Sequence, residues 1–187
     1  MRLWSAAFHE LLIFRDEPKD YLAAKILVMT LDTLFRAESV SFGVSATHKK
    51  QLFTEMAKLL EATGALQDTD IAVRDVVAAT LERERLGSTG VGNGVAVPHA
   101  RLEGIERVYG AFALLETPMD YDSIDGRPVD LAAMLIAPTD AGSEHLRALA
   151  QISRRLRREN IRARLRAAPN AQSLYICLTD EEQMTAA

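Results

Sequence analysis

"VDLAAMLIAP", residues 129–138, decides the fold class, because Asp130 is the only charged residue in this run. A strand with one face in water alternates apolar and polar residues, whereas a strand covered on both faces is apolar at nearly every position. The run is too short to cross a membrane as a helix. It is therefore predicted to be a buried strand of a sheet that is covered on both faces.

Three further segments have the composition of strands. GVAVP at residues 94–98 and VYGAFALLE at residues 108–116 are short apolar runs bounded by turn-forming residues. SLYICLT at residues 173–179 is also apolar nearly throughout. It is predicted to be the closing strand, with Cys177 buried in it.

Helical periodicity occupies the segments on either side of the block formed by residues 94–138. Residues 47–64 place their apolar side chains on one helix face, with Thr47 as the predicted N-cap and Gly64 as the stop. Residues 69–85 are predicted to form a second helix, and two more are predicted between residues 143 and 168. Helices around a block of buried strands predict an α/β layered domain.

The composition indicates one globular domain. The chain has 187 residues, of which 48% are hydrophobic and 26% are charged. The formal net charge of −4 argues against a general nucleic-acid binder. Because the longest apolar runs are far shorter than the roughly 20 residues of a spanning helix, no direct membrane insertion is expected.

Cysteine usage and the N-terminus bear on the compartment. Cys177 is the only cysteine, which excludes an internal disulfide and a multi-thiolate metal site within the chain. It is predicted to be a small core residue in a reducing compartment. The first residues, MRLWSAAFHELLIF, lack the uninterrupted apolar core of a secretory signal. A cytoplasmic location is therefore expected.

The first 28 residues differ from the rest of the sequence. Met29 is a candidate initiator, so residues 1–28 are predicted to be an N-terminal extension, either poorly ordered or the product of an upstream start. Within them, an amphipathic helix is expected around Tyr21 to Leu27 at best. Residues 29–187 are predicted to form the single domain.

Arginines concentrate between residues 147 and 166. Two interpretations are open: the solvated face of one or two helices, or a docking patch for an acidic partner. The eight residues are Arg147, Arg154, Arg155, Arg157, Arg158, Arg162, Arg164 and Arg166.

A glycine-rich segment, GSTGVGNGVAVPHARLEG at residues 87–104, precedes the predicted strands. Gly87 and Gly92 have the spacing of a Walker loop, but Asn93 and Gly94 stand where its lysine and hydroxyl residue belong. The segment also enters a strand, whereas a dinucleotide-binding fingerprint opens a helix. The glycines are therefore interpreted as room for close approach of the backbone.

Histidines supply a second interpretation of the same segment. Pro98 is predicted to end the strand at residues 94–98, which presents His99 at a strand end. His145 lies in the first turn of a predicted helix and faces inward, where free backbone N–H groups favour an anion. The sequence ERER adds Arg83 and Arg85 just before the glycines. Together these groups predict a site for a phosphoryl group.

RERLGSTGVGNGVAVPHARLEG closely resembles the phosphohistidine motif of enzyme IIA domains in the bacterial phosphoenolpyruvate-dependent phosphotransferase system. The branch is that of mannitol and fructose, which includes the nitrogen-regulatory proteins. ETPMDYDSIDGRPVDLAAMLIAP and HLRALAQISRRL follow in the family's order and spacing, so the resemblance covers about residues 29–180. It implies one domain with a mixed β-sheet and helices on both faces.

The same resemblance implies roles for three residues. His99 matches the phosphorylated histidine, His145 the second histidine that orients the phosphate or holds a proton, and Arg83 the arginine that supports the phosphoryl charge. Ala100 and Arg101 stand where many relatives have glycine and lysine, which keeps the positive charge. Neutral imidazole is itself a nucleophile, so no cofactor or metal site is expected.

Three functional hypotheses follow. In the first, His99 accepts phosphate from an HPr-like phosphocarrier, and the phosphorylation state selects a nitrogen-regulatory protein target. In the second, a fructose- or mannitol-type IIA passes phosphate to a IIB partner. The third is an interaction module that is never phosphorylated.

A calcium site is the competing interpretation of the acidic loop. Asp120, Asp122 and Asp125 precede Gly126, but an EF-hand loop needs glutamate at its twelfth position, where this sequence has Leu131. These aspartates are predicted to be turn and loop residues.

Overall fold

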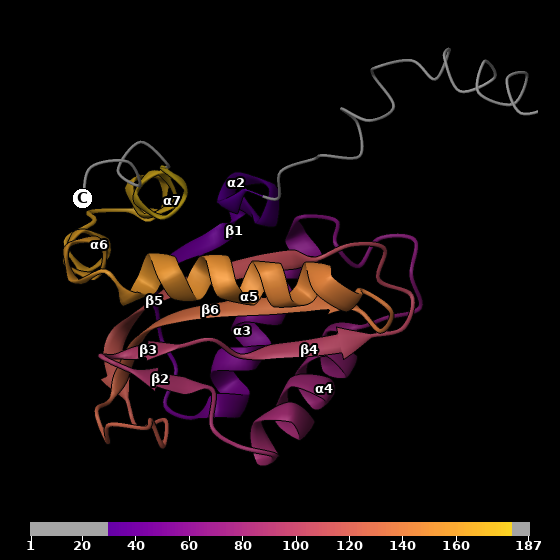
Figure 1. The fold of residues 1–187 in the computed structure, drawn as a ribbon, viewed down its shortest axis with the longest axis horizontal. Helices are drawn as coiled ribbons and strands as arrows, with labels where there is room; N and C mark the ends of the chain where they lie inside the picture. The colour runs from indigo at the N-terminus through magenta and orange to yellow at the C-terminus, as the bar shows by residue number, and fades with distance from the viewer. Residues whose placement is uncertain (1–29, 181–187) are drawn as a thin grey trace, which may run out of the picture.

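The computed structural model describes residues 30–180, in which one mixed sheet lies between two layers of helices (Figure 1). The strand order is β1-β5-β6-β3-β2. β4 also pairs with β6, further along that strand than β3 does. β6 is antiparallel to β5 and parallel to β3 and β4. The strands are β1 (Phe35–Val44), β2 (Gly90–Gly92), β3 (Val95–Ala96), β4 (His99–Leu102), β5 (Tyr109–Met119) and β6 (Val129–Pro138).

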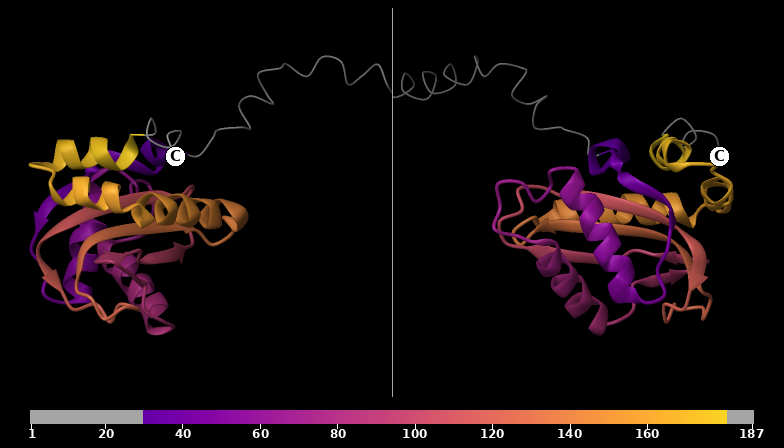
Figure 2. Two further views of the ribbon diagram at one scale, coloured as in Figure 1. Left: turned by 60° about the vertical axis from the view of Figure 1, so that its left-hand side comes forward. Right: turned by 180° about the vertical axis from the view of Figure 1, so that it is seen from behind.

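Two groups of helices cover the two faces of this sheet. α3 and α4 cross the face that is turned away in Figure 1, as the rear view in Figure 2 shows, and α5 crosses the other. α6 and α7 continue the α5 layer and pack beside each other. The helices are α2 (Leu31–Leu34), α3 (Lys49–Ala62), α4 (Val73–Arg85), α5 (Gly142–Arg157), α6 (Glu159–Arg166) and α7 (Ala171–Thr179).

The central strand confirms the α/β prediction. Alternate residues of β6 point to opposite faces. Leu131 and Leu135 belong to the core beneath α5–α7, whereas Met134 and Ile136 belong to the core beneath α3 and α4. All four side chains are fully buried. The continuous apolar run is therefore explained by two separate cores, one on each side of the same strand.

The prediction of a closing strand at residues 173–179 is wrong, because these residues form the helix α7. Asn170 caps it, since its side-chain oxygen accepts a hydrogen bond from the backbone N–H of Ser173 at 2.9 Å. Leu174, Cys177 and Leu178 are buried at helical spacing. Because the exposed Ile176 is also apolar, the helical spacing of the buried residues could not be recognised in the sequence.

Four elements were not predicted: the short elements α2, β2 and β4, and the ten-residue strand β1. β1 lies at the edge of the sheet and pairs with β5 in parallel, with register shifts after Phe35 and after Phe42. These shifts break the two-residue alternation that identifies a strand. Its sequence, FRAESVSFGV, therefore carries no clear strand period.

The four predicted helices are present as α3, α4, α5 and α6, and the first two begin later than predicted. α3 begins at Lys49, and its N-cap is His48, not Thr47: the His48 Nδ1 atom accepts from the backbone N–H of Gln51 at 3.2 Å. α4 begins at Val73, so residues 69–72 lie outside it. No helix of residues 30–180 is both long and apolar enough to cross a membrane. The predictions for residues 1–28 lie outside the described residues.

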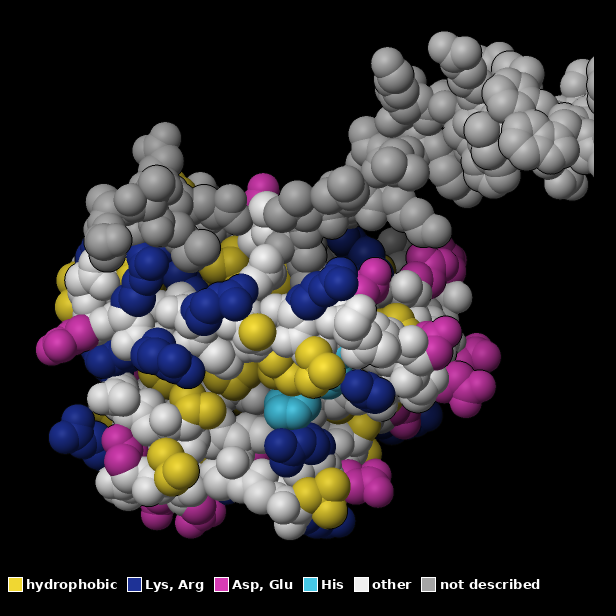
Figure 3. Space-filling view, viewed as in Figure 1, with side chains coloured by type: hydrophobic (Ala, Val, Ile, Leu, Met, Phe, Trp, Pro, Cys, Tyr) yellow, Lys and Arg dark blue, Asp and Glu magenta, His cyan; other side chains and the backbone are white. Residues whose placement is uncertain are grey.

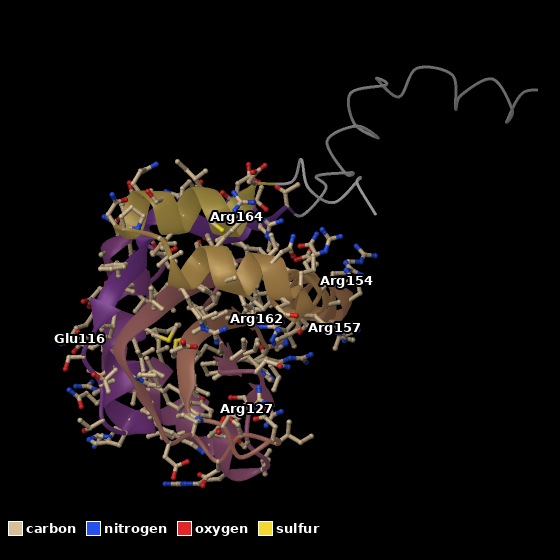
Figure 4. The ribbon with its side chains drawn as sticks, turned by 90° about the vertical axis from the view of Figure 1, so that its left-hand side faces the viewer. Glu116, Arg127, Arg154, Arg157, Arg162 and Arg164 are labelled. Carbon is tan, nitrogen blue, oxygen red and sulfur yellow. The ribbon has the colours of Figure 1, made fainter. Side chains whose placement is uncertain are left out.

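The arginine-rich segment is not a uniform solvated face. Arg155 and Arg162 are buried. Arg155 donates a hydrogen bond to the carbonyl oxygen of Cys177 in α7, and Arg162 donates one to the carbonyl oxygen of Leu156 in α5. Arg166 forms two hydrogen bonds with the Asp130 carboxylate, at 2.6 and 2.7 Å, and so ties α6 to β6. The exposed members include those labelled on the outer surface in Figure 4, Arg154, Arg157 and Arg164.

Candidate functional site

The glycine-rich segment, residues 87–104, forms β2, β3 and β4 and the connections between them. Gly92 and Gly94 have φ angles of +89° and +78°, which L side chains rarely adopt. Gly90 has a different constraint: a Cβ atom there would lie 2.9 Å from the Ser123 Cα atom. The interpretation as room for close backbone approach is therefore confirmed at Gly90, where the approaching backbone belongs to the loop after β5.

His99 opens the strand β4. β3 stops at Ala96, Pro98 separates it from β4, and both strands run parallel to β6. His99 thus lies at a strand end, as predicted, but at the beginning of β4. Among the described strands β4 pairs with β6 alone, so its other edge is free of strand neighbours.

Two hydrogen bonds fix the His99 ring. Its Nδ1 atom lies 3.0 Å from the carbonyl oxygen of Val97, so Nδ1 carries the proton and donates. Its Nε2 atom accepts a hydrogen bond from Nε of Arg83 at 3.1 Å. The lone pair of the ring is therefore on Nε2, on the side that faces the arginine.

Arg83 reaches His99 from the last turn of α4. Its Nη1 atom also donates to the carbonyl oxygen of Gly87 at 3.1 Å, which holds the guanidinium against the start of the glycine segment. The side chain is half-buried. A cation thus lies beside the Nε2 lone pair of His99, an arrangement that could bind a negatively charged group.

His145 approaches His99 from the opposite helical layer. It lies in the first turn of α5 and is 4% exposed. The centroids of the two imidazole rings are 5.4 Å apart, and the rings meet edge to face at 64°. The Nδ1 atom of His145 accepts from Nε of Arg101 at 3.1 Å, and its buried Nε2 atom has no partner among the described residues.

The environment keeps both imidazoles neutral. Burial is the main reason that the pKa of His145 falls to about 4, and the neighbouring His99 and Arg101 lower it further. Burial also lowers the pKa of His99; Arg83 and Arg101 act in the same direction, whereas the Val97 carbonyl and Glu84 oppose it. A neutral imidazole retains the lone pair that a nucleophile needs.

A buried polar network that was not predicted lies behind the site. Glu84, which follows Arg83, accepts from the backbone N–H of Thr89 at 3.0 Å and from its hydroxyl at 2.5 Å. Nζ of Lys49 lies 3.0 Å from the same carboxylate, and the Thr89 hydroxyl is 3.1 Å from that of Tyr121. The network ties the end of α4 to the glycine segment.

Figure 3 shows histidine surface at the centre of one face, between hydrophobic side chains and lysine or arginine side chains. Two of the exposed apolar residues adjoin the site along the chain. Leu86 follows the last turn of α4 and is 83% exposed, and Leu146 follows His145 and is 63% exposed. The histidine site is therefore open at the surface and bordered by apolar side chains.

The acidic loop is engaged with protein groups. A carboxylate oxygen of Asp122 lies 2.9 Å from Nζ of Lys49, and Asp125 accepts from the backbone N–H of Asn93 at 2.8 Å. Asp125 also accepts from the backbone N–H of Arg127. Within residues 30–180 no three His, Cys, Asp or Glu side chains are grouped as a metal ion would require.

Comparisons with known proteins identify relatives across the described region. A nitrogen regulatory protein of Bradyrhizobium diazoefficiens is 42% identical over 151 residues, which cover 80% of this chain and 95% of that protein. The crystal structure of nitrogen regulatory protein IIA-Ntr from Neisseria meningitidis has a TM-score of 0.72 and 32% identity, and the match covers 80% of this chain and 99% of that one.

A more distant structure shares the fold alone. It is the complex of mannitol IIA with phosphorylated mannitol IIB from Escherichia coli, with 20% identity, a TM-score of 0.63, and coverage of 77% of this chain and 96% of that one. The family model described as "phosphoenolpyruvate-dependent sugar phosphotransferase system, EIIA 2" matches residues 33–181. That match spans every strand and helix from β1 to α7, and so the chain belongs to the type 2 EIIA family of the phosphotransferase system.

Proposed function

We propose that this chain is a regulatory phosphocarrier in which His99 accepts a phosphoryl group from a phosphorylated HPr-like protein. The observation that carries the proposal is the orientation of the His99 ring. The Val97 carbonyl holds the proton on Nδ1 at 3.0 Å, which leaves the lone pair on Nε2 beside Arg83. A nucleophile thus faces a cation at an open, apolar-bordered surface.

The transfer requires no separate base. The lone pair on His99 Nε2 forms a new N–P bond as the N–P bond to the donor imidazole breaks, and the bonding electrons return to the donor nitrogen. The proton on His99 Nδ1 stays in place. Its hydrogen bond to Val97 stabilises the positive charge that the ring acquires.

Arg83 and His145 would stabilise the phosphorylated state. The Arg83 guanidinium releases the His99 lone pair and pairs with phosphoryl oxygens, which carry up to about two negative charges. The unpaired Nε2 atom of His145 lies in the neighbouring ring and supplies a further hydrogen-bond donor. Positioning and electrostatic stabilisation of this kind account for most of the catalysis of phosphoryl transfer.

Regulation is favoured over transport by the relatives. The nitrogen regulatory proteins of Bradyrhizobium and Neisseria match this chain over almost their whole length. The transport alternative is supported by the fructose-specific EIIABC component of Bacillus subtilis, which is 32% identical over 155 residues, but that match covers only 24% of the relative. On this basis the phosphorylation state of His99 would decide which regulatory target is bound.

Labelling tests the acceptor. Wild type is incubated with phosphoenolpyruvate labelled with ³²P, enzyme I and an HPr-like carrier, beside His99→Ala. A matched control is His48→Asn, which removes a histidine elsewhere and replaces its Nδ1 atom with a side-chain oxygen that can accept at the cap of α3. We expect label in wild type and His48→Asn and none in His99→Ala. Equal labelling of wild type and His99→Ala, or labelling of neither, would overturn the assignment of His99.

Two further measurements separate the hypotheses. Rapid transfer of label to a sugar-specific IIB protein would support transport, whereas slow transfer supports regulation. A pull-down with wild type and with His99→Asp, in which the carboxylate adds negative charge at the site, tests the switch. If wild type and His99→Asp capture identical sets of partners, the switch model is wrong, and the chain is an interaction module that does not depend on phosphorylation.

A further inference from the structure

Arg101 shares a strand and a strand face with His99. The two residues are two positions apart on β4, and alternate residues of a strand point to the same side. Ala100, between them, is buried on the other side. Their strand partners, Leu135 and Ala137, lie in the core beneath α5–α7. Both side chains therefore rise toward the helix that carries His145.

The contact between Arg101 and His145 determines where the His145 ring carries its proton. Arginine is a donor only and stays protonated, so its Nε–H must meet a lone pair. That lone pair is on Nδ1 of His145, 3.1 Å away. In a neutral imidazole the other nitrogen then carries the proton. His145 is accordingly the tautomer with its proton on Nε2.

The two imidazoles are thus held in opposite tautomers by two different arginines. His99 carries its proton on Nδ1 and meets Arg83 through Nε2. His145 carries its proton on Nε2 and meets Arg101 through Nδ1. The first arrangement leaves a lone pair for the nucleophile, and the second leaves a buried N–H that no described residue accepts.

We propose that Arg101 is a positioning residue that holds His145 as the Nε2–H tautomer, so that this N–H donates a hydrogen bond to the phosphoryl group on His99. The proposal rests on the proposed function of His99 as phosphoryl acceptor. The pairing explains why a buried donor has no partner in the unphosphorylated protein, because the phosphoryl oxygen is the acceptor that is still to arrive.

A carboxylate in place of Arg101 would have the reverse effect. It would accept from Nδ1–H, and so favour either the Nδ1–H tautomer of His145 or a charged imidazolium. An apolar residue would leave Nδ1 without a donor. Lysine keeps a donor and a positive charge but lacks the planar guanidinium, which the carbonyl oxygen of Thr139 also contacts at 3.5 Å from Nη1.

Nitrogen-15 NMR of the histidine rings tests the first half of the proposal without any phosphorylation. In wild type at neutral pH, we expect the His145 Nδ1 resonance of an unprotonated ring nitrogen and the Nε2 resonance of a protonated one. Arg101→Met should shift both resonances toward the average of the two tautomers, and Arg101→Lys should restore the wild-type pattern in large part. A matched control is Arg154→Met, which removes an exposed charge from α5.

The rate of phosphoryl transfer from the HPr-like carrier tests the second half. Loss of one hydrogen bond to a charged group predicts a rate about tenfold lower in Arg101→Met, and near-wild-type rates in Arg101→Lys and Arg154→Met. His145→Gln should be slowed as much as Arg101→Met, and the double variant should be no slower than either. This equality is expected only if Arg101 acts through His145.

The possible outcomes distinguish failure of the Arg101 proposal from failure of the proposed function. Unchanged His145 nitrogen resonances in Arg101→Met would overturn the proposal whatever the rate does, because Arg101 would then act by charge alone. Altered resonances with an unchanged rate would also overturn it. If wild-type protein shows the expected tautomers but takes no label, the proposed function fails and the tautomer assignment stands.

Discussion

At the scale of single residues, the two site histidines respond to acid in an unusual range. Their pKa values are lowered, that of His145 to about 4, so both rings stay neutral in the folded protein at pH values where an ordinary histidine is charged. The unfolded chain takes up protons near pH 6.5, and the folded chain does so only at lower pH. Folding stability therefore falls as the pH drops below about 6.5.

His145→Gln tests this linkage. Between pH 7.5 and 5.5, His145 alone should cost wild type about 1 kcal/mol of unfolding free energy, because only the unfolded state binds the proton. Urea unfolding at the two pH values should show a smaller loss in His145→Gln than in wild type. An equal loss in the two proteins would contradict the lowered pKa of His145.

Arg83 yields a second prediction at this scale. Its guanidinium contacts both His99 and the Gly87 carbonyl, which a shorter neutral side chain cannot do. Arg83→Gln should lower the rate of His99 labelling roughly 10- to 100-fold through loss of a charge-assisted contact, and Arg83→Lys should recover part of that rate. Stopped-flow or quench-flow transfer from the labelled carrier measures both. Equal rates for Gln and Lys would show that the charge at residue 83 does not matter.

At the scale of elements, the join between α4 and the glycine segment depends on one buried carboxylate. Thr89→Val removes the hydroxyl that donates to Glu84 and contacts Tyr121, while it keeps the side-chain shape. We expect a loss of about 1–3 kcal/mol in unfolding free energy, because the buried Glu84 carboxylate loses a donor.

Thr89→Ser is the matched control, since it retains the hydroxyl. Chemical denaturation of the three proteins should rank wild type close to Thr89→Ser and well above Thr89→Val. If Thr89→Val unfolds at the wild-type midpoint, the network does not stabilise this join.

Elements whose apolar residues follow a regular pattern were predictable from the sequence. β6 is apolar at every position except Asp130, and the apolar residues of the α3, α4 and α5 segments repeat at helical spacing, so the positions of these elements follow from burial alone. α7 and β1 were missed because local sequence does not reveal tertiary contacts: Ile176 is apolar yet exposed, and register shifts disrupt β1.

The site was predictable as a set of residues, but not its internal geometry. His99, His145 and Arg83 were singled out, and the structure brings them together. Their roles remain predictions. One sequence feature pointed to the Arg101–His145 contact: Arg101 lies two residues after His99 in the sequence. Glu84 had none, because burial of a carboxylate depends on the loop that folds over it.

At the scale of the whole molecule, Cys177 reports on global stability. It is the only cysteine in the sequence, it is 5% exposed, and burial raises the pKa of its thiol. We expect a thiol-specific reagent to label it slowly in buffer and rapidly above the urea unfolding midpoint. Fast labelling in buffer would show that α7 opens independently of the sheet. Cys177→Ser in the same assay controls for reaction elsewhere.

His99 stands on an edge strand, and it meets Arg83 from the helical layer on one face of the sheet and His145 from the layer on the other. No half of the molecule holds the complete set. If His99 is the phosphoryl acceptor, as proposed, a copy with either helical layer detached would have lost Arg83 or His145 and would accept phosphate slowly.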